Sequence, residues 1–177
     1  MKRISSNVRV KAKKIQLLLL DVDGVLTDGR IIIDERGVET KQFHVRDGQG
    51  IALLLRSGID VGFITSRISG SVRHRAKELG VRLVRQGVRN KLLAYNEIKR
   101  ARGLRDAQIA YIGDDLVDLP ILRQAGLAVC VSDSSRELVT NVDLVTAARG
   151  GRGAVRETAD LLLHAQGKWP SLSKLFL

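Results

Sequence analysis

The sequence has little of several features that other classes of protein need. Cys130 is the only cysteine, so no intrachain disulfide can form, and a reducing cytoplasm is the expected location. Aromatic residues make up only 3% of the chain, which leaves no stacking platform for single-stranded nucleic acid. No apolar run approaches the roughly 20 residues that a membrane-spanning helix needs. The basic start also lacks the apolar stretch of a secretory signal. These absences favour a cytoplasmic protein that binds neither nucleic acid nor a membrane.

Positive charge is in excess. Lys and Arg number 30 against 19 Asp and Glu, which gives a formal net charge of +11. Such a surface either binds nucleic acid or steers small anionic substrates toward a cleft. We expect the second role and keep nucleic-acid binding as a minor alternative, because the basic residues are scattered along the chain. The densest basic stretch, residues 2–14, is interpreted as a solvated tail.

Strand-like and helix-like patterns alternate along the rest of the chain. Residues 15–23, IQLLLLDVD, form a continuous apolar run, as expected for a strand buried on both faces of a parallel sheet. Residues 30–34 and 38–45 predict the arms of a short β-hairpin with Gly37 in its turn. Further strands are expected at 59–66, 81–86, 109–115, 127–131 and 143–147, and helices at 47–57, 69–79, 90–102, 119–124, 134–138 and 153–165, with Ser134 capping the helix at 134–138. This order predicts one α/β domain with a mainly parallel sheet.

Polar residues follow three of the predicted strands. Asp21 and Asp23 end the first, Thr65 ends the second long strand, and Asp114 and Asp115 end a third. Ligands of an open parallel sheet bind beyond the carboxyl ends of its strands. A single Asp there usually caps the next turn, but repeated carboxylates at strand ends favour a cation. We expect Mg²⁺, which takes carboxylate and carbonyl oxygens, since the His- or Cys-rich spacing of a zinc site is absent.

The same segments resemble a known family. DVDGVLTD (21–28), GFITSR (62–67), QGVRNK (86–91) and GDDLVD (113–118) are similar to the four motifs of the haloacid dehalogenase (HAD) superfamily of phosphatases. KQFHVRDGQGI and GGRGAVRE resemble segments of one subfamily, the 3-deoxy-D-manno-octulosonate 8-phosphate (KDO 8-phosphate) phosphatases. The resemblance spans Ile15 to Gly167 and implies a three-layer, Rossmann-like fold. Ser66 departs from the subfamily pattern, where a glycine often precedes the arginine.

The resemblance also implies how the chain is divided. HAD enzymes usually cover their site with an inserted cap domain, but residues 28–47 leave room only for the hairpin and residues 65–91 only for a helix and a strand. We therefore expect a capless phosphatase domain over 15–167. It would be preceded by the basic tail 1–14 and followed by an apolar tail, 168–177.

Neighbouring subunits would then have to close the site. The resemblance implies a homotetramer in which the hairpins pack together and present surfaces to adjacent active sites. The apolar tail includes Trp169, Leu172 and residues 175–177. Two alternatives stay open for it: packing on its own subunit or on a neighbour.

Five residues receive central roles from the resemblance. Asp21 would be the nucleophile that forms an aspartyl-phosphate, and Asp23 the general acid and base. Mg²⁺ would be held by the side chains of Asp21 and Asp114 and by the backbone carbonyl of Asp23. Thr65 and Lys91 would bind phosphoryl oxygens. Lys91 begins a helix, where the like-signed dipole end favours an anion nearby.

Other residues are assigned to the surroundings of this centre. Asp115 and Asp118 are expected either to orient metal-bound waters or to hold Lys91, and Asp118 is equally suited to cap the helix at Pro120. Besides Asp23, the residues expected to contact the substrate are Thr27, Arg46, Arg67 and Arg152. A guanidinium group binds a sugar-acid carboxylate with two parallel hydrogen bonds, which is why the arginines are included.

The expected function is that of a Mg²⁺-dependent phosphomonoesterase. Its substrate would be KDO 8-phosphate, converted to KDO and phosphate during the synthesis of lipopolysaccharide precursors. The same chemistry on a nine-carbon, sialic-acid-type 2-keto acid 9-phosphate is the alternative. A phosphotransferase or mutase would need a cap to exclude water, and none is encoded. A non-catalytic binding protein is a remote alternative, because Asp21 and Asp23 are both present.

Overall fold

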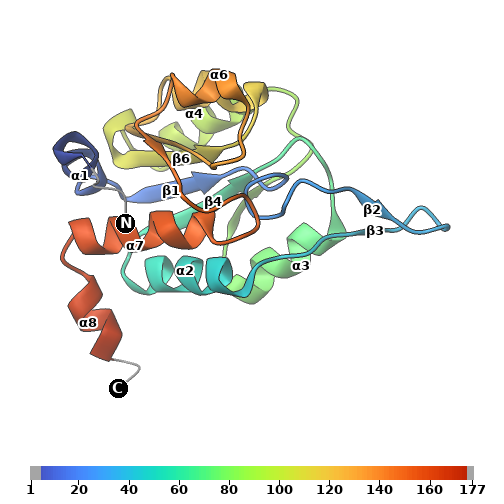
Figure 1. Ribbon diagram of the computed structural model, residues 1–177, viewed down its shortest axis with the longest axis horizontal. Helices are drawn as coiled ribbons and strands as arrows, with labels where there is room; N and C mark the ends of the chain where they lie inside the picture. Colours follow the sequence, from blue (N-terminus) through green and yellow to red (C-terminus); the bar gives the residue numbers. More distant parts are fainter. Residues whose placement is uncertain (1–4, 175–177) are drawn as a thin grey trace.

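A six-stranded parallel sheet forms the centre of the computed structural model, which describes residues 5–174 (Figure 1). Every pairing within this sheet is parallel. In spatial order its strands are β5 (Leu83–Arg85), β4 (Asp60–Ile64), β1 (Leu17–Leu20), β6 (Ile109–Gly113), β7 (Leu127–Cys130) and β8 (Leu144–Val145). The predicted strands are therefore confirmed, although most are shorter than their sequence patterns.

All four residues of β1 are leucines, because the strand is buried on both faces of the sheet. Successive side chains of a strand point to opposite faces of its sheet. Leu18 and Leu20 enter the core on one face, and Leu17 and Leu19 enter the core on the other. Because helices cover both faces, neither set of leucines reaches solvent.

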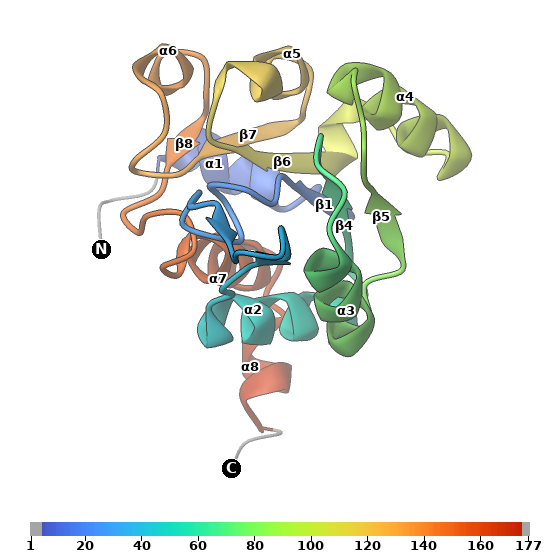
Figure 2. The ribbon, with the colours of Figure 1, turned by 90° about the vertical axis from the view of Figure 1, so that its right-hand side faces the viewer.

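The helices form a layer on each side of the sheet (Figure 2). One layer contains α1 (Ser6–Ala12), α2 (Val45–Arg56), α3 (Gly70–Leu79) and α7 (Ala154–Ala165). The other contains α4 (Lys91–Ala101), α5 (Leu119–Leu122) and α6 (Arg136–Val139). The expected three-layer α/β fold is thus confirmed. No helix within residues 5–174 has the length and apolar character needed to cross a bilayer.

The predicted β-hairpin projects from the body of the molecule (Figure 1). Strands β2 (Ile32–Ile33) and β3 (Glu39–Thr40) pair antiparallel. The Asp34 carboxylate accepts hydrogen bonds from the backbone amides of Arg36 and Val38, which closes the turn. Between β1 and α2 the chain forms only this hairpin, and between β4 and α4 only α3 and β5, as expected for a capless enzyme.

The basic segment at the start is not a solvated tail over its whole length. Residues 6–12 form α1, and Val8 and Ala12 are buried against α7. The amide of Gln166 donates hydrogen bonds to the carbonyls of Ala12 and Ile15 and so ties the segment to the end of α7. A helix this short carries too few apolar residues for its periodicity to stand out among the basic ones.

The described part of the apolar tail, residues 168–174, packs on its own subunit. Trp169 and Leu172 lie in α8 (Trp169–Ser173) and pack on their own subunit, with Trp169 stacked on His164. Residues 175–177 lie outside the described part. One cap was wrong: Ser135, and not Ser134, is the N-cap of α6. The division into segments 1–14, 15–167 and 168–177 stays a prediction.

Candidate active site

The carboxyl ends of three neighbouring strands carry the polar residues that the sequence placed there. Strand β1 lies between β4 and β6, with Leu20 level with Phe63 on one side and Ile112 on the other. The amide of Asp21 continues this pairing with a 3.0 Å hydrogen bond to the carbonyl of Ile112. Asp21, Thr65 and Asp114 therefore leave the sheet at the same edge.

Three carboxylates meet at this edge. Asp21, Asp114 and Asp118 each place one oxygen so that the three oxygens lie within 4.8 Å of one another. Asp21 is only 5% exposed and Asp118 is fully buried. Burial, together with the charges of Asp21 and Asp118, raises the pKa of Asp114 to about 8. Burial and the charge of Asp118, partly offset by Lys91, raise the pKa of Asp21 to about 6. The cluster carries more negative charge than its surroundings neutralise.

These residues fit a magnesium ion. Of the three carboxylates, Asp118 has both oxygens engaged: Oδ1 accepts from Lys91 Nζ at 2.8 Å and Tyr111 Oη at 2.6 Å, and Oδ2 accepts from the amide of Asp114 at 3.1 Å. Asp21 is engaged as well, since its Oδ1 accepts from the amide of Val22 at 2.7 Å and its Oδ2 lies 2.8 Å from Lys91 Nζ. The Asp114 carboxylate accepts no hydrogen bond from residues 5–174, so it has the freest oxygens of the three. A hard divalent cation prefers such ligands, and its charge would relieve the repulsion between them. The cluster of Asp21, Asp114 and Asp118 can thus hold Mg²⁺, and the choice of Asp21 and Asp114 as its side-chain ligands stays a prediction.

Lys91 links the nucleophile candidate to Asp118. Asn90 caps α4 by accepting from the amide of Leu93, and the side chain of Lys91, the first helical residue, turns into the cluster. Its Nζ lies 2.8 Å from Asp21 Oδ2 and 2.8 Å from Asp118 Oδ1. Burial opposes the charged form, but the two carboxylates outweigh it and raise the pKa of Lys91. The anion that the sequence predicts near this helix start is therefore present.

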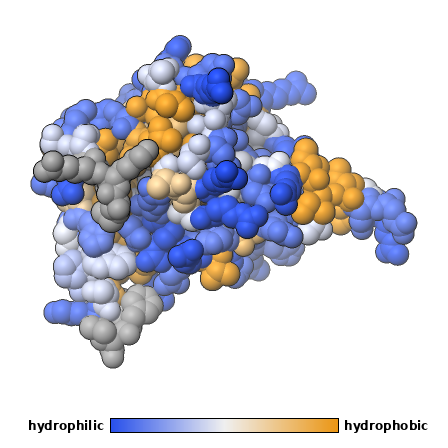
Figure 3. Space-filling model, in the orientation of Figure 1, coloured by the Kyte–Doolittle hydropathy of each residue, from blue (hydrophilic) through white to orange (hydrophobic). Residues whose placement is uncertain are grey.

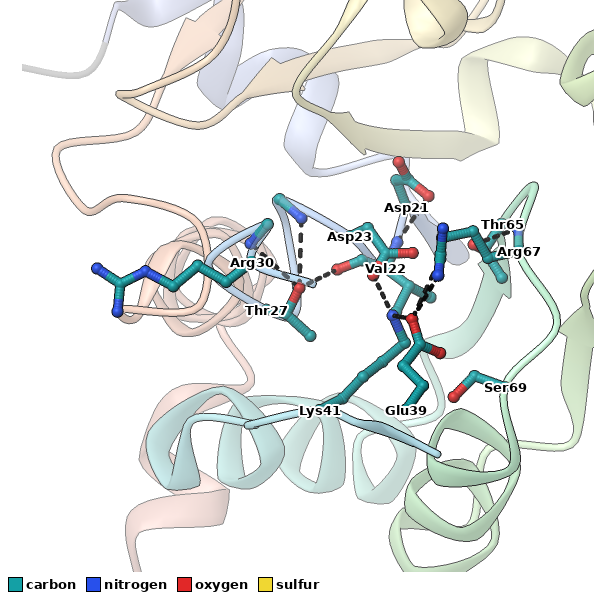
Figure 4. A network of polar contacts seen from close by, with 12 residues as sticks. Asp21, Val22, Asp23, Thr27, Arg30, Glu39, Lys41, Thr65, Arg67 and Ser69 are labelled. Atoms are coloured by element: carbon teal, nitrogen blue, oxygen red, sulfur yellow. Dashed lines mark hydrogen bonds and ion pairs between the residues drawn. The ribbon is translucent and has the colours of Figure 1, made fainter. Parts of the chain in front are cut away.

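Asp23 and Arg67 lie near Asp21 (Figure 4), and their side chains are more exposed than that of Asp21. The Asp23 carboxylate pairs with Lys41 Nζ, which comes from the chain just after β3. Thr65 is buried at the end of β4, where its hydroxyl accepts from the amide of Arg67 at 3.3 Å. The Arg67 guanidinium donates to Glu39 Oε1, with Nη2 at 2.7 Å. Residues from the strand ends and the hairpin are thus joined by one set of polar contacts.

Known proteins resemble this chain over nearly its full length. A family model described as haloacid dehalogenase-like hydrolase matches residues 64–155. The 3-deoxy-D-manno-octulosonate 8-phosphate phosphatase of Escherichia coli strain B is 47% identical over 165 residues, which is 93% of this chain and 88% of that protein. The chain belongs to the haloacid dehalogenase-like hydrolase family.

Solved structures of such hydrolases have the same fold. The 3-deoxy-D-manno-octulosonate 8-phosphate phosphatase from Yersinia pestis superposes with a TM-score of 0.92 at 45% identity, covering 93% of this chain and 89% of that one. The enzyme from Moraxella catarrhalis superposes with a TM-score of 0.95 at 41% identity, covering 98% and 100%. That crystal structure contains magnesium, phosphate and KDO. The family resemblance read from the motifs is confirmed.

Three roles were left open for Asp118 of this hydrolase: orienting metal-bound waters, holding Lys91 and capping the helix at Pro120. The structure bears on the last two. Asp118 is the N-cap residue of α5, but its side chain makes no capping hydrogen bond there. It holds Lys91 instead. Asp115 does not share this role: it is exposed, and its Oδ1 accepts from the amide of Leu116 at the start of the next turn.

Thr27 is placed differently from the expectation. The residue is buried, and its hydroxyl accepts from the amides of Gly24 and Gly29 and donates to the carbonyl of Val22. All of these groups belong to the loop that follows β1. This placement favours a role in shaping the nucleophile loop of the hydrolase over the predicted contact with substrate.

Two of the predicted substrate-binding arginines form no ion pair or hydrogen bond with the carboxylate cluster within residues 5–174. Arg46 is exposed in the first turn of α2 and forms no ion pair within residues 5–174. Arg152 is also exposed, and its Nη2 lies 3.5 Å from Asp28 Oδ2 at the rim of the nucleophile loop. Of the three predicted arginines, Arg67 alone is linked to Asp23 within residues 5–174, through Glu39 and Lys41. The assigned roles of Arg46 and Arg152 stay predictions.

The GGRG segment has a structural role that the sequence did not reveal. The amide of Gly151 donates to the carbonyl of Val25 at 2.9 Å. A Cβ on Gly150 would lie 1.7 Å from the carbonyl oxygen of Gly24, so the two backbones pack without a side chain between them. Nearby, the buried Asp47 carboxylate accepts from the amide of Arg156 at 2.7 Å and ties α2 to the start of α7. These segments buttress the nucleophile loop.

Three site residues were missed by sequence reasoning. Tyr111 donates to Asp118 from within β6, while Lys41 and Glu39 reach the site from the hairpin. A hydroxyl in the strand before GDDLVD was a weak signal for Tyr111. Lys41 begins the segment KQFHVRDGQGI that resembles the subfamily, but nothing in that resemblance pointed to its partner Asp23, which lies 18 positions away across the hairpin.

Proposed function

We propose that this protein is a Mg²⁺-dependent phosphomonoesterase that hydrolyses KDO 8-phosphate to KDO and phosphate. The observation that carries the proposal is the buried cluster in which Lys91 bridges Asp21 and Asp118 beside Asp114. Relatives at 47% identity have this named activity, and the Moraxella catarrhalis structure contains magnesium, phosphate and KDO. The conversion would belong to the synthesis of lipopolysaccharide precursors in the cytoplasm.

The first half of the reaction transfers the phosphoryl group to Asp21. An Asp21 carboxylate oxygen attacks phosphorus, the bond from phosphorus to the sugar oxygen breaks, and Asp23 donates a proton to that oxygen as it leaves. Asp21 Oδ1 accepts a 2.7 Å hydrogen bond from the amide of Val22, which fixes the orientation of the carboxylate. Lys91, at 2.8 Å from Asp21 Oδ2, comes within reach of the transferred group's oxygens.

The second half releases phosphate. Asp23 accepts a proton from water as the water attacks phosphorus, the bond from phosphorus to Asp21 breaks, and the free carboxylate returns. The Thr65 hydroxyl, at the neighbouring strand end, would bind the phosphoryl oxygens during both halves. Mg²⁺, when bound by Asp21, Asp114 and the carbonyl of Asp23, supplies positive charge that offsets the repulsion between the carboxylates and the phosphate.

Substrate choice would depend on the other end of the molecule. Arg67 sits where the hairpin meets the site, so its guanidinium is the best-placed group to bind a sugar-acid carboxylate. Arg46 and Arg152 are proposed to contribute where subunits meet, since neither forms an ion pair with the cluster of its own subunit within residues 5–174. The excess of positive charge favours the approach of an anion.

A panel of sugar phosphates tests this proposal. Values of kcat/KM are measured with Mg²⁺ for KDO 8-phosphate, a nine-carbon 2-keto acid 9-phosphate and neutral hexose phosphates. KDO 8-phosphate should rank first; a higher value for the nine-carbon acid would move the assignment to that substrate. Asp21→Asn should abolish turnover without changing the thermal unfolding midpoint by more than a few degrees, and steady-state hydrolysis by this variant would rule out Asp21 as the nucleophile.

A homotetramer is proposed as the active form. The hairpin exposes four large apolar side chains, which form a visible patch (Figure 3): Ile31, Ile32, Ile33 and Val38. Contiguous apolar surface of this kind is typical of an interface. Sedimentation should give a tetramer for the native chain and smaller species for Ile33→Asp, while Leu93→Asp on the exposed face of α4 should stay tetrameric. A monomeric native chain would refute this part.

A further inference from the structure

A chain of alternating charges crosses the mouth of the site from the nucleophile loop to the loop after β4 (Figure 4). It consists of Asp23, Lys41, Glu39 and Arg67, and we call it the hairpin bridge. Lys41 Nζ donates to Asp23 Oδ1 and, at 3.2 Å, to Glu39 Oε1. The same Glu39 oxygen accepts from Arg67 Nε at 3.2 Å and from Nη2 at 2.7 Å. Two of the four members belong to the hairpin arm, which no catalytic motif includes.

Lys41 is the best shielded member of the hairpin bridge. Its side chain is 1% exposed, whereas that of Asp23 is 24% exposed. A buried ammonium group is stable only when carboxylates surround it, because removing it from water costs several kcal/mol. Asp23 and Glu39 are the two carboxylates that pair with Lys41 within residues 5–174. The ion pair therefore limits the rotation of the Asp23 carboxylate and keeps the Lys41 ammonium group paired inside the protein.

The geometry leaves one oxygen of Asp23 available. Oδ1 is occupied by Lys41, while Oδ2 accepts no hydrogen bond from the described residues. An acid catalyst on a partly exposed loop loses effectiveness when its carboxyl group rotates, and displacements of about 1 Å cost on the order of 100-fold in rate. Holding Oδ1 selects one orientation and presents Oδ2 to the leaving oxygen.

We propose that Lys41 is a positioning residue that fixes the Asp23 carboxylate for proton transfer, and that Glu39 couples this lysine to Arg67. This inference rests on the proposed phosphatase activity. Lys41 touches neither the phosphoryl group nor the attacking oxygen; it acts through Asp23. Glu39 anchors the guanidinium of Arg67 and so sets where a carboxylate of the substrate is bound.

The dependence on the leaving group separates positioning from general damage to the fold. Phenolate needs a proton when it leaves phosphorus, whereas p-nitrophenolate leaves as a stable anion, and the two esters have nearly the same shape. If Lys41 positions the acid, Lys41→Met should lower kcat/KM for phenyl phosphate about tenfold more than for p-nitrophenyl phosphate. For KDO 8-phosphate, kcat should fall while KM changes less than threefold.

Two milder variants keep the test decisive. Lys41→Gln keeps a hydrogen-bond donor on a side chain of similar length, so it should fold. Its loss of kcat/KM should again be greater for phenyl phosphate than for p-nitrophenyl phosphate, but by a smaller factor than in Lys41→Met. Glu39→Gln leaves the contact between Lys41 and Asp23 in place; it should raise KM for KDO 8-phosphate several-fold and leave the ratio of the two aryl phosphates unchanged. Lys99→Met, which removes an ion pair to Asp106 on the far side of α4, is the matched control and should change neither quantity.

The outcomes distinguish this inference from the proposed function. Hydrolysis of KDO 8-phosphate by the native enzyme, with equal losses on both aryl phosphates in Lys41→Met and Lys41→Gln, would overturn the positioning role alone. A native protein that hydrolyses no phosphomonoester in the presence of Mg²⁺ would overturn the proposed function first. An unchanged KM for Glu39→Gln would remove the coupling to Arg67.

Discussion

Replacing Lys91 by methionine tests how much this one cation contributes to the free energy of unfolding. The methionine has a similar length but removes the charge that lies 2.8 Å from both Asp21 and Asp118. No other cation pairs with these two carboxylates within residues 5–174. Breaking a buried ion pair by removing one partner costs about 3–5 kcal/mol. We expect a loss of about 3 kcal/mol at pH 8 without metal, since partial protonation of the carboxylates relieves some of the repulsion.

The loss should depend on pH in a defined direction. The pKa of Asp21 is about 6 and that of Asp114 about 8 in the folded protein, both above the ordinary value of 3.8. Groups with raised pKa values favour the folded state at low pH, and this contribution disappears as the pH rises through those values. At pH 5 the carboxyl groups of Asp21 and Asp114 are mostly protonated, so the positive charge of Lys91 stabilises the cluster less. The difference in stability between the native protein and Lys91→Met should therefore be smaller at pH 5 than at pH 8.

Urea unfolding in the presence of EDTA measures this difference at both pH values. Lys99→Met is the control, because its partly exposed pair with Asp106 should contribute no more than about 1 kcal/mol at either pH. With saturating Mg²⁺, Lys91→Met should also lower kcat by about 100-fold or more, since a donor to the phosphoryl oxygens is lost. An equal loss of stability at pH 5 and pH 8 would show that the charge of Lys91 is not what stabilises the cluster.

Two further predictions concern the metal-binding edge. Gly24 has a φ of +85°, and a Cβ there would lie 2.0 Å from Asp114 Oδ2. Gly24→Ala should thus lose about 2 kcal/mol in urea unfolding and weaken Mg²⁺ binding in calorimetry, whereas Gly37→Ala, with a φ of +77° but nothing within 4 Å, should show only the backbone strain of about 1 kcal/mol. Because protons compete with Mg²⁺ for Asp21 and Asp114, the rise in thermal unfolding midpoint on adding Mg²⁺ should grow between pH 6 and pH 8.5. A shift that is constant over this range, or smaller at high pH, would contradict the assignment of these carboxylates as ligands.

The order of strands and helices was largely predictable. Apolar runs such as the leucines of β1, and the glycines that end several helices, depend on local periodicity and backbone conformation, which the sequence carries directly. The positions of Asp21, Thr65 and Asp114 at one edge followed from the rule that parallel strands end together. Helix α1 was missed because seven residues, two of them basic, give too weak a pattern.

Individual contacts in the site were harder to predict. A carboxylate at position 118 suits a helix cap, a metal or a lysine equally well until Tyr111, Lys91 and the amide of Asp114 are seen around it. A hydroxyl at position 27 is equally ambiguous until the loop closes around it. Polar side chains have many possible partners, and only packing selects among them.

The sequence was sufficient for the class of fold, the strand ends that carry the chemistry, the metal expected there and the family. These depend on periodicity, spacing and residue type, which are local properties. Three-dimensional packing was needed to show that Lys91 is held by Asp118, that Thr27 shapes its own loop, and that Lys41 reaches Asp23 from the hairpin. Such pairings join residues far apart in the chain. Each polar side chain could pair with several others, and burial in the folded protein makes one of these pairings much more favourable than the rest.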